Sequence, residues 1–152
     1  MILALDPATL CGWATPIASG TWDLSVRPDE STGMRLIRFD AKLRELCNRD
    51  RITRITLIVF EAQRGSVPGR EGATVVKGEL QGVLKLFCIN QNIEFRGYSP
   101  SEIKKHATGK GNCGKLEMLA AAKLKWPGRR FVDDNEVDAV WLLDLAMKEY
   151  PQ

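Results

Sequence analysis

The sequence has little of what several common classes of protein require. It has a single histidine, His106, and its four cysteines are far apart, so that no C-x-x-C pair is present. This spacing argues against a structural zinc site and is typical of reduced cysteines in a cytosolic protein. No apolar run is long enough to span a membrane, and the N-terminal segment lacks the positively charged start of a signal peptide. We therefore expect a cytoplasmic protein that is not associated with a membrane.

The chain also lacks repeats, low-complexity segments and a long linker. Its 152 residues, 44% hydrophobic and 27% charged, are typical of one domain over residues 1–152. Two continuous apolar runs predict buried strands at 1–5 and 55–60. Further strands are expected at 11–18, 21–24 and 93–98, with a turn at Ser19-Gly20, and helices at 34–47, 73–89, 116–124 and 137–147. Pro100 fits the first turn of another helix, which Ser99 would cap. This order predicts an α/β fold with a mixed sheet.

Charge is distributed unevenly along the chain, although the net charge is only +3. The segment 96–130 carries nine Lys and Arg residues against two acids, a balance of +7, and the rest of the chain has a balance of −4. A basic segment in an otherwise acidic chain is typical of a surface that binds a polyanion. A solvated helical face gives the same pattern, so charge alone leaves both interpretations open.

Acidic residues stand where the buried strands are expected to end. Asp6 follows the first apolar run and Glu61 follows the run ITLIVF, and the ends of strands in an α/β sheet are where ligands bind. A third acidic group, DDNEVD at 133–138, opens a final apolar helix; its first two acids have a purely structural explanation as helix caps. Asp138 precedes the apolar run AVWLL and is expected to face inward, where an acid is costly unless it is paired or binds a metal.

Several carboxylates on rigid elements suit one chemistry in particular. Hydrolysis of a phosphodiester can use two divalent ions, one that activates water and one that stabilises the leaving oxygen. Oxygen ligands favour Mg²⁺ or Mn²⁺ over zinc. The acids therefore indicate a metal-dependent nuclease.

Four segments, in this order and spacing, resemble the RuvC family of Holliday-junction resolvases, especially its phage-type members. They are LALDPATLCGWA, LIVFEAQRG, YSPSEIKKHATGKGNCGKLEML and DDNEVDAVWLL. The resemblance extends from Met1 to about Tyr150 and implies an RNase H-like fold, with a central mixed sheet flanked by helices on both faces. It implies a homodimeric crossover junction endodeoxyribonuclease that nicks two opposed strands of a four-way junction during recombination, repair or phage DNA processing.

The resemblance also assigns catalytic acids. Asp6, Glu61 and Asp138 match three metal-binding acids of the family, which are expected to hold two Mg²⁺ ions, with Mn²⁺ as a substitute. The family usually has an acid or a histidine three residues before the last aspartate, where this chain has Asn135. Asp134 is taken as the fourth catalytic and metal-binding residue instead. The alternatives are Glu136 and the amide oxygen of Asn135 itself.

Basic residues acquire roles from the same resemblance. Lys115 matches a lysine after a glycine-rich turn of the family and is expected to stabilise phosphate charge during catalysis. The expected contacts to the DNA backbone are Lys104, Lys105, Lys110 and Lys115. The loop 61–72 lacks the aromatic residue with which bacterial members open the junction, so Arg64 or Arg70 is expected to engage the backbone there. Ala8 is a further departure, because many members have glycine at this position.

The helix expected at 73–89 resembles the dimer helix of the family. Gly78 and Gly82, four residues apart, would let a second backbone approach, and we expect Gly82 and Leu80 to be important for the dimer. Three other functions remain open. The substrate could be flaps or forks as well as four-way junctions. An actin-like ATP-binding domain would need a glycine-rich turn after Asp6 and a longer chain, and a non-catalytic DNA-binding protein would have no use for acids that repel phosphate.

Overall fold

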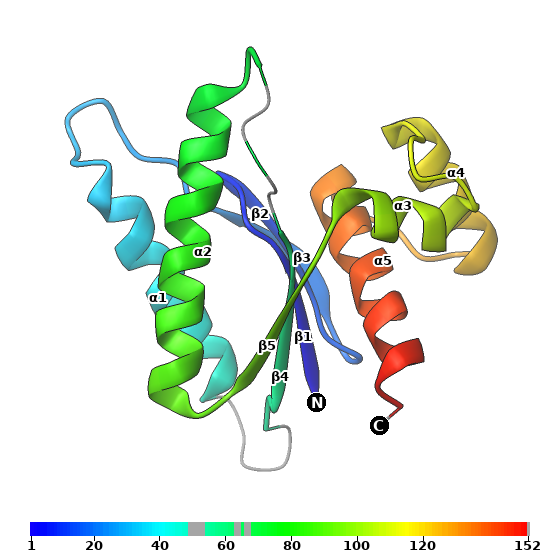
Figure 1. Cartoon of the computed structure of the whole chain (residues 1–152), viewed down its shortest axis with the longest axis horizontal. Helices are drawn as coiled ribbons and strands as arrows, with labels where there is room; N and C mark the ends of the chain where they lie inside the picture. Colours follow the sequence, from blue (N-terminus) through cyan, green and yellow to red (C-terminus); the bar gives the residue numbers. More distant parts are fainter. Residues whose placement is uncertain (49–53, 63–64, 66–67, 152) are drawn as a thin grey trace.

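The computed structural model describes residues 1–48, 54–62, 65 and 68–151. In these residues the chain forms five strands and five helices (Figure 1). The strands are β1 (Ile2–Asp6), β2 (Leu10–Ala14), β3 (Ser19–Asp23), β4 (Leu57–Glu61) and β5 (Glu94–Tyr98). The helices are α1 (Gly33–Cys47), α2 (Glu71–Gln91), α3 (Pro100–Thr108), α4 (Lys115–Lys125) and α5 (Asp134–Glu149). No helix in this described part of the chain is long and apolar enough to cross a membrane.

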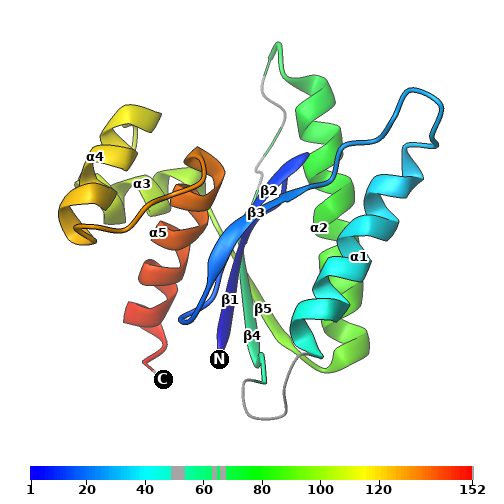
Figure 2. The same cartoon turned by 180° about the vertical axis from the view of Figure 1, so that it is seen from behind.

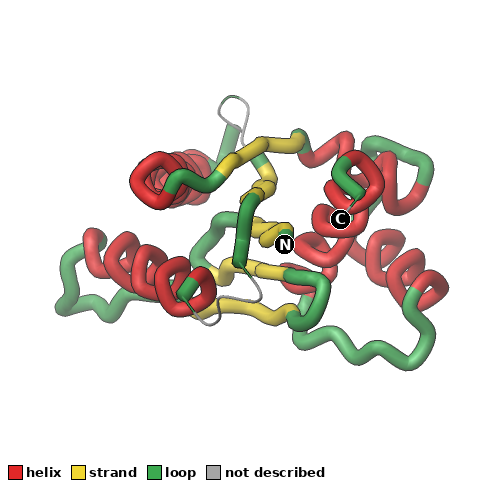
Figure 3. The backbone as a smooth tube through the Cα atoms, turned by 90° about the horizontal axis from the view of Figure 1, so that it is seen from below, coloured by secondary structure: helices red, strands yellow, loops and turns green. Residues whose placement is uncertain are grey.

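The strands form one mixed sheet in the order β3-β2-β1-β4-β5. Strand β1 pairs antiparallel with β2 and parallel with β4, β2 pairs antiparallel with β3, and β4 pairs parallel with β5. Figures 1 and 2 show α1 and α2 on one side of the sheet and α3, α4 and α5 on the other. The view from below in Figure 3 shows the strands between these two groups of helices. The predicted mixed α/β sheet with helices on both faces is confirmed.

The side chains of the buried strands alternate between the two faces of the sheet, which explains why helices cover both faces. In β1, Ile2 and Ala4 belong to the core shared with α5, whereas Leu3 and Leu5 belong to the core shared with α1 and α2. Strand β4 alternates in the same way. Successive side chains of a strand point to opposite faces, so a continuous apolar run is needed when both faces are covered. The apolar runs of the sequence therefore encode a central sheet.

The turn between β2 and β3 was expected at Ser19-Gly20, and this expectation is wrong. The turn is formed by 15–18, where the backbone N–H of Thr15 donates to the carbonyl of Ala18 over 2.7 Å. The Thr15 hydroxyl also donates to that carbonyl and accepts from the Ala18 N–H. Gly20 instead lies in β3 opposite Trp13, where an added Cβ would meet the indole at 3.2 Å. The glycine marks close packing rather than a turn.

Helix α3 begins as the sequence predicts. Ser99 is its N-cap, its hydroxyl accepts from the backbone N–H of Glu102, and the Glu102 carboxylate accepts from the N–H of Ser99. Pro100 occupies the first turn, where no N–H is required. This reciprocal pair of hydrogen bonds fixes the start of the helix that carries Lys104 and Lys105.

Candidate active site

Asp6 and Glu61 lie side by side at one end of the central strands. Leu5 pairs with Phe60 across the parallel β1–β4 ladder, so the acids that follow them are neighbours. Asp6 continues the alternation of Ile2 and Ala4, which places it on the face of the sheet that α5 covers. Asp6 is only 9% exposed. The local sequence, a buried strand ended by an acid, thus delivers two carboxylates to one edge of the sheet.

The start of α5 is held against this edge by a close backbone contact. Gly12 in β2 pairs with Asp6, and a Cβ added to Gly12 would lie 1.9 Å from the backbone oxygen of Asn135. Real Cβ atoms do not approach this closely, so only glycine lets the first turn of α5 pack onto β2. This contact brings Asp134 and Asp138, one turn apart on α5, towards Asp6. The importance of Gly12 was not predicted, although the glycine lies within one of the four motif segments.

The acids at the start of α5 divide into two groups. The Asp133 carboxylate caps the helix by accepting from the backbone N–H of Glu136 at 2.9 Å, and it accepts from the Thr21 hydroxyl at 2.6 Å. Burial raises the pKa of Asp133, but hydrogen bonds from Thr21 and from Asn135 outweigh burial and hold it below its ordinary value. Asp133 is therefore structural, and Asn135 is one of its partners.

Glu136 is also structural. It is 4% exposed, its carboxylate accepts from the backbone N–H of Val132 at 2.6 Å, and it accepts a hydrogen bond from the Ser19 hydroxyl. Arg129 donates to the same hydroxyl over 2.6 Å. These contacts attach α5 to β3 and to the preceding loop. Because its oxygens are used there, Glu136 is a poor choice for the fourth ligand, so Asp134 and Asn135 remain as candidates.

The electrostatics of the acids show a concentration of negative charge. Burial, reinforced by the charges of Asp6, Glu61 and Asp134, raises the pKa of Asp138 from 3.8 to about 7. Burial and the charge of Asp6 also raise the pKa of Glu61, against the opposing charges of Lys77 and Lys104. Burial and the neighbouring acids therefore make Asp138 and Glu61 harder to ionise. A cation among them would relieve this repulsion.

Lys77 supplies such a cation and was not identified from the sequence. Its ammonium donates to Asp6 Oδ1 at 3.1 Å and to Glu61 Oε1 at 2.5 Å. In the described residues, no three acidic, histidine or cysteine side chains form a group ready to hold a metal ion. Asp6 and Glu61 are thus joined through a lysine. Sequence offered no signal for this contact, because Lys77 lies on a helix that packs from the opposite face.

The predicted basic residues differ in their distance from the acids. Lys115, the first residue of α4, pairs with Asp134, and this hydrogen bond raises the pKa of Lys115. Lys104 is close enough for its charge to lower the pKa of Glu61. Lys105 and Lys110 are exposed, as is Arg70 at the start of α2. Arg64 lies outside the described residues.

Helix α2 corrects one expectation about the dimer. Leu80 is fully buried in the core beneath α1 and α2, so it is unavailable to a second chain. Gly78 and Gly82 do lie open, since an added Cβ at either would meet nothing within 4 Å. Leu80 belongs to the buried face of α2, with Leu84 and Phe87, and not to its outer face.

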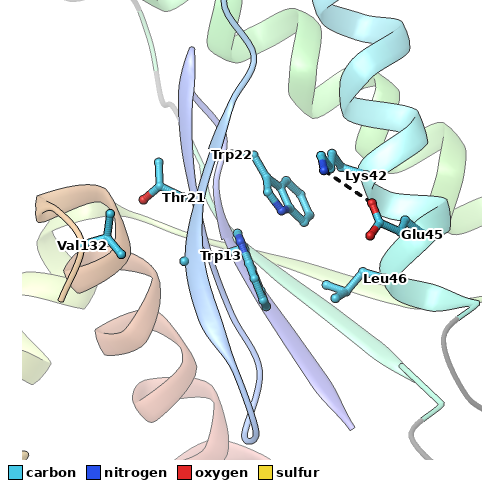
Figure 4. A pocket seen from close by; sticks show the side chains of 8 residues that line it. Trp13, Thr21, Trp22, Lys42, Glu45, Leu46 and Val132 are labelled. Atoms are coloured by element: carbon cyan, nitrogen blue, oxygen red, sulfur yellow. Dashed lines mark hydrogen bonds and ion pairs between the residues drawn. The ribbon is translucent and has the colours of Figure 1, made fainter. Parts of the chain in front are cut away.

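A pocket of about 360 Å³ lies apart from the acids, between β3 and α1 (Figure 4). Trp13 and Trp22 line it and stack with their ring centroids 5.7 Å apart. Lys42 and Glu45 of α1 pair on its other side, with 3.4 Å between nitrogen and oxygen. None of the acids described above contributes to it. The candidate active site is therefore at the ends of β1 and β4 and not in this pocket.

No protein-family model matches the chain, but individual known proteins match it in sequence. The RuvC crossover junction endodeoxyribonuclease of Brachyspira hyodysenteriae is 38% identical over 68 residues, which are 44% of this chain and only 42% of that protein. The enzyme of the same name from Chlamydia muridarum is 30% identical over 145 residues, 90% of this chain and 83% of that protein. The chain belongs to the RuvC family.

Solved structures match this RuvC-family chain over 98% of its length. Thermus thermophilus RuvC, in complex with a Holliday junction substrate, aligns over 98% of this chain and 93% of its own, with a TM-score of 0.71. At 17% sequence identity this likeness bears on the fold. It confirms the RNase H-like α/β fold that the sequence motifs imply.

Proposed function

We propose that this RuvC-family chain is a metal-dependent crossover junction endodeoxyribonuclease that resolves Holliday junctions by paired nicking of opposed strands. The observation that carries the proposal is that Asp6 and Glu61 end two neighbouring strands and that the close packing of Gly12 on Asn135 brings the start of α5 against them. The charges of Asp6, Glu61 and Asp134 act on Asp138 from there. The named activities of the RuvC relatives support it. The expected roles are in recombination, repair or phage DNA processing, carried out by one nuclease domain.

The side chains present fit divalent metal ions. The proposed ligands are Asp6, Glu61, Asp134 and Asp138, all of which offer the oxygen donors that Mg²⁺ prefers. Burial, together with the charges of Asp6, Glu61 and Asp134, raises the pKa of Asp138, and a bound cation would favour its ionised form. Two Mg²⁺ ions, or Mn²⁺ in their place, would activate water and stabilise the leaving oxygen. The chain itself contributes the rigid strand ends and the helix that keep the acids in place.

The proposed DNA surface is the basic side of α3 and α4. Lys104 and Lys115 lie next to the acids, whereas Lys105 and Lys110 extend the positive surface outward. Arg70, at the start of α2, is a further proposed contact. So is Arg64, which lies outside the described residues. We place the protein in the cytoplasm, because its four cysteines are free thiols, two of them completely buried.

The four lysines are expected to behave differently when each is changed to alanine. Lys104→Ala, Lys105→Ala and Lys110→Ala should each weaken junction binding and reduce the slope of log affinity against log salt by roughly one, because one phosphate contact is lost. Lys115→Ala should lower single-turnover cleavage more than affinity, because its charge is most useful at the reacting phosphate. Salt titrations in an Asp6→Asn background and single-turnover assays with Mg²⁺ measure the two effects.

Lys42→Ala serves as the control, since Lys42 lies on α1 by the separate pocket. If Lys104→Ala, Lys105→Ala and Lys110→Ala all bind the junction like the wild type, the segment 96–130 is a solvated face. A Lys115→Ala enzyme that binds weakly but cuts normally at saturation would make Lys115 one more backbone contact.

The dimer is proposed to form through the outer face of α2. Val75, Gly78, Gly82, Leu86 and Ile89 are spaced three or four residues apart, so they form one stripe along the helix. The three apolar side chains are 58–69% exposed, and both glycines are open. Such a stripe suits a two-fold contact between identical helices, and a symmetric dimer would present two sites to two opposed strands.

Gly82→Phe and Leu86→Glu are expected to convert the dimer to monomers, because one blocks close approach and the other buries a charge. Light scattering at micromolar concentration measures the mass, and the loss of paired nicking should accompany it. Leu124→Glu is the matched control, since Leu124 is also an exposed leucine, on α4. A monomeric wild-type protein would show that α2 is not a dimer helix.

The function itself is tested with a labelled four-way junction and a matched linear duplex, each incubated with Mg²⁺, Mn²⁺ or EDTA. Symmetric nicks in the junction alone, with either metal but not with EDTA, are the expected result. A second candidate is a nuclease for branched DNA in general, which the lack of an aromatic residue in 61–72 favours. Equal cleavage of flaps and forks would support it. Cleavage of no branched substrate would refute both.

A further inference from the structure

Lys77 is a nearly buried lysine that forms ion pairs with two of the candidate acids, Asp6 and Glu61. It projects from α2 and is 12% exposed, and the two carboxylates that it contacts are 12% and 18% exposed. One turn later on the same helix, the Gln81 amide donates to the backbone carbonyl of Glu61 at 3.2 Å. Helix α2 therefore reaches the end of β4 with two side chains, one charged and one neutral. This contact is specific and is sheltered from solvent.

The surroundings explain why a lysine is stable there. An ammonium removed from water is costly unless opposite charges surround it. Burial by itself would lower the pKa of Lys77, but the charges of Asp6 and Glu61 outweigh burial and raise it. The acids gain as well, because the ammonium offsets their mutual repulsion. Lys77 is thus the internal counter-ion of the two strand-end carboxylates.

We propose that Lys77 holds the place of a divalent ion in the metal-free protein and has to leave it before Asp6 and Glu61 can bind metal. The inference rests on the proposed function, in which these two acids are ligands. A divalent ion held by both acids would bind carboxylates that the ammonium already contacts, through Asp6 Oδ1 and Glu61 Oε1. Two cations on the same pair of carboxylates would repel each other strongly. Lys77 and the metal therefore compete for one position.

Competition has two consequences for the protein. Lys77 lowers the affinity for metal, because part of the binding free energy is used to break its two charged hydrogen bonds. It also stabilises the metal-free fold, which would otherwise carry unpaired buried acids. Both consequences can be measured without DNA and without catalysis.

Calorimetric titration of the wild-type protein with MnCl₂ and MgCl₂ tests the first consequence. Lys77→Met, which keeps the length of the side chain without its charge, should bind either ion about tenfold more tightly or better, as expected for removing competing charged hydrogen bonds. Lys77→Gln should change affinity in the same direction. Lys85→Met is the control, because Lys85 lies two turns further along α2 and contacts the Phe60 ring instead. Equal or weaker metal binding by both Lys77 variants overturns the proposal.

Thermal unfolding tests the second consequence. In EDTA, Lys77→Met should unfold at a lower temperature than the wild type, and saturating Mn²⁺ should stabilise it more than it stabilises the wild type. A variant as stable as the wild type in EDTA contradicts the counter-ion role. Failure of the proposed function looks different: the wild type would then bind neither ion and cut no branched DNA. If the wild type binds metal and cuts, and Lys77→Met has unchanged affinity, only the inference about Lys77 is overturned.

Discussion

Asp6→Asn, Glu61→Gln and Asp138→Asn are each expected to reduce single-turnover cleavage of a four-way junction by roughly a thousandfold or more. Each change removes a charged ligand from the proposed metal site, and metal ions contribute several kcal/mol to such a reaction. Binding to the junction should be retained or strengthened, because a negative charge that repels phosphate is lost. Gel-shift titration in EDTA measures binding, and single-turnover assays with Mg²⁺ measure cleavage.

Asp40→Asn is the matched control for these substitutions. Asp40 pairs with Arg44 on the surface of α1, away from the strand edge, so its variant should cut like the wild type. Near wild-type cleavage by Asp6→Asn would refute the site. The fourth ligand is assigned by a comparison within α5: Asp134→Ala should cost far more activity than Asn135→Ala. The reverse order would give that role to the amide of Asn135.

The metal-free protein should be stabilised by Asp138→Asn above neutral pH. The pKa of Asp138 is about 7 in the folded chain and near 3.8 when the carboxyl is free. Between these values the folded state holds a proton that the unfolded state releases, so the free energy of unfolding falls as pH rises. The Asp138→Asn variant does not lose stability in this way, because its amide does not ionise. At pH 8 in EDTA it should be more stable than the wild type by roughly 2–4 kcal/mol.

Denaturant unfolding at several pH values checks this expectation. The advantage of Asp138→Asn should disappear below about pH 4, where the carboxyl is protonated in both states of the wild type. Asp40→Asn should show no comparable gain. Saturating Mg²⁺ should reverse the order, because only the wild type keeps the full set of ligands and gains stability from binding. A variant less stable than the wild type at pH 8 in EDTA would show that the acids do not repel one another as described.

The sequence by itself determined the elements and two of the acids. Apolar runs that end in Asp6 and Glu61 imply buried strands with carboxylates at their ends, because alternation and burial are properties of the local chain. The Ser99-Pro100 start of α3 was predicted for the same reason, since a helix cap is a contact between near neighbours. The motifs added the RNase H-like fold and the prediction that Asp138 is a metal ligand.

Sequence was less reliable where several local roles were possible. The group DDNE contains two structural acids and one candidate ligand, and only the packing of α5 on β2 and β3 assigns Asp133 and Glu136 to structure. The Ser19-Gly20 turn was wrong for a similar reason. Gly20 serves the packing of Trp13 across the sheet, and the turn is made by Thr15 and Ala18.

The tertiary structure alone decided what lies between the acids. Lys77 comes from the helix on the opposite face of the sheet, and Gly12 admits the backbone of Asn135 from a segment more than a hundred residues away. No sequence periodicity or motif spacing predicts either contact, because each depends on how two elements that are distant in the sequence pack together. The strand ends and their carboxylates are local properties, whereas the charge balance of the site arises only when α2 and α5 pack around them.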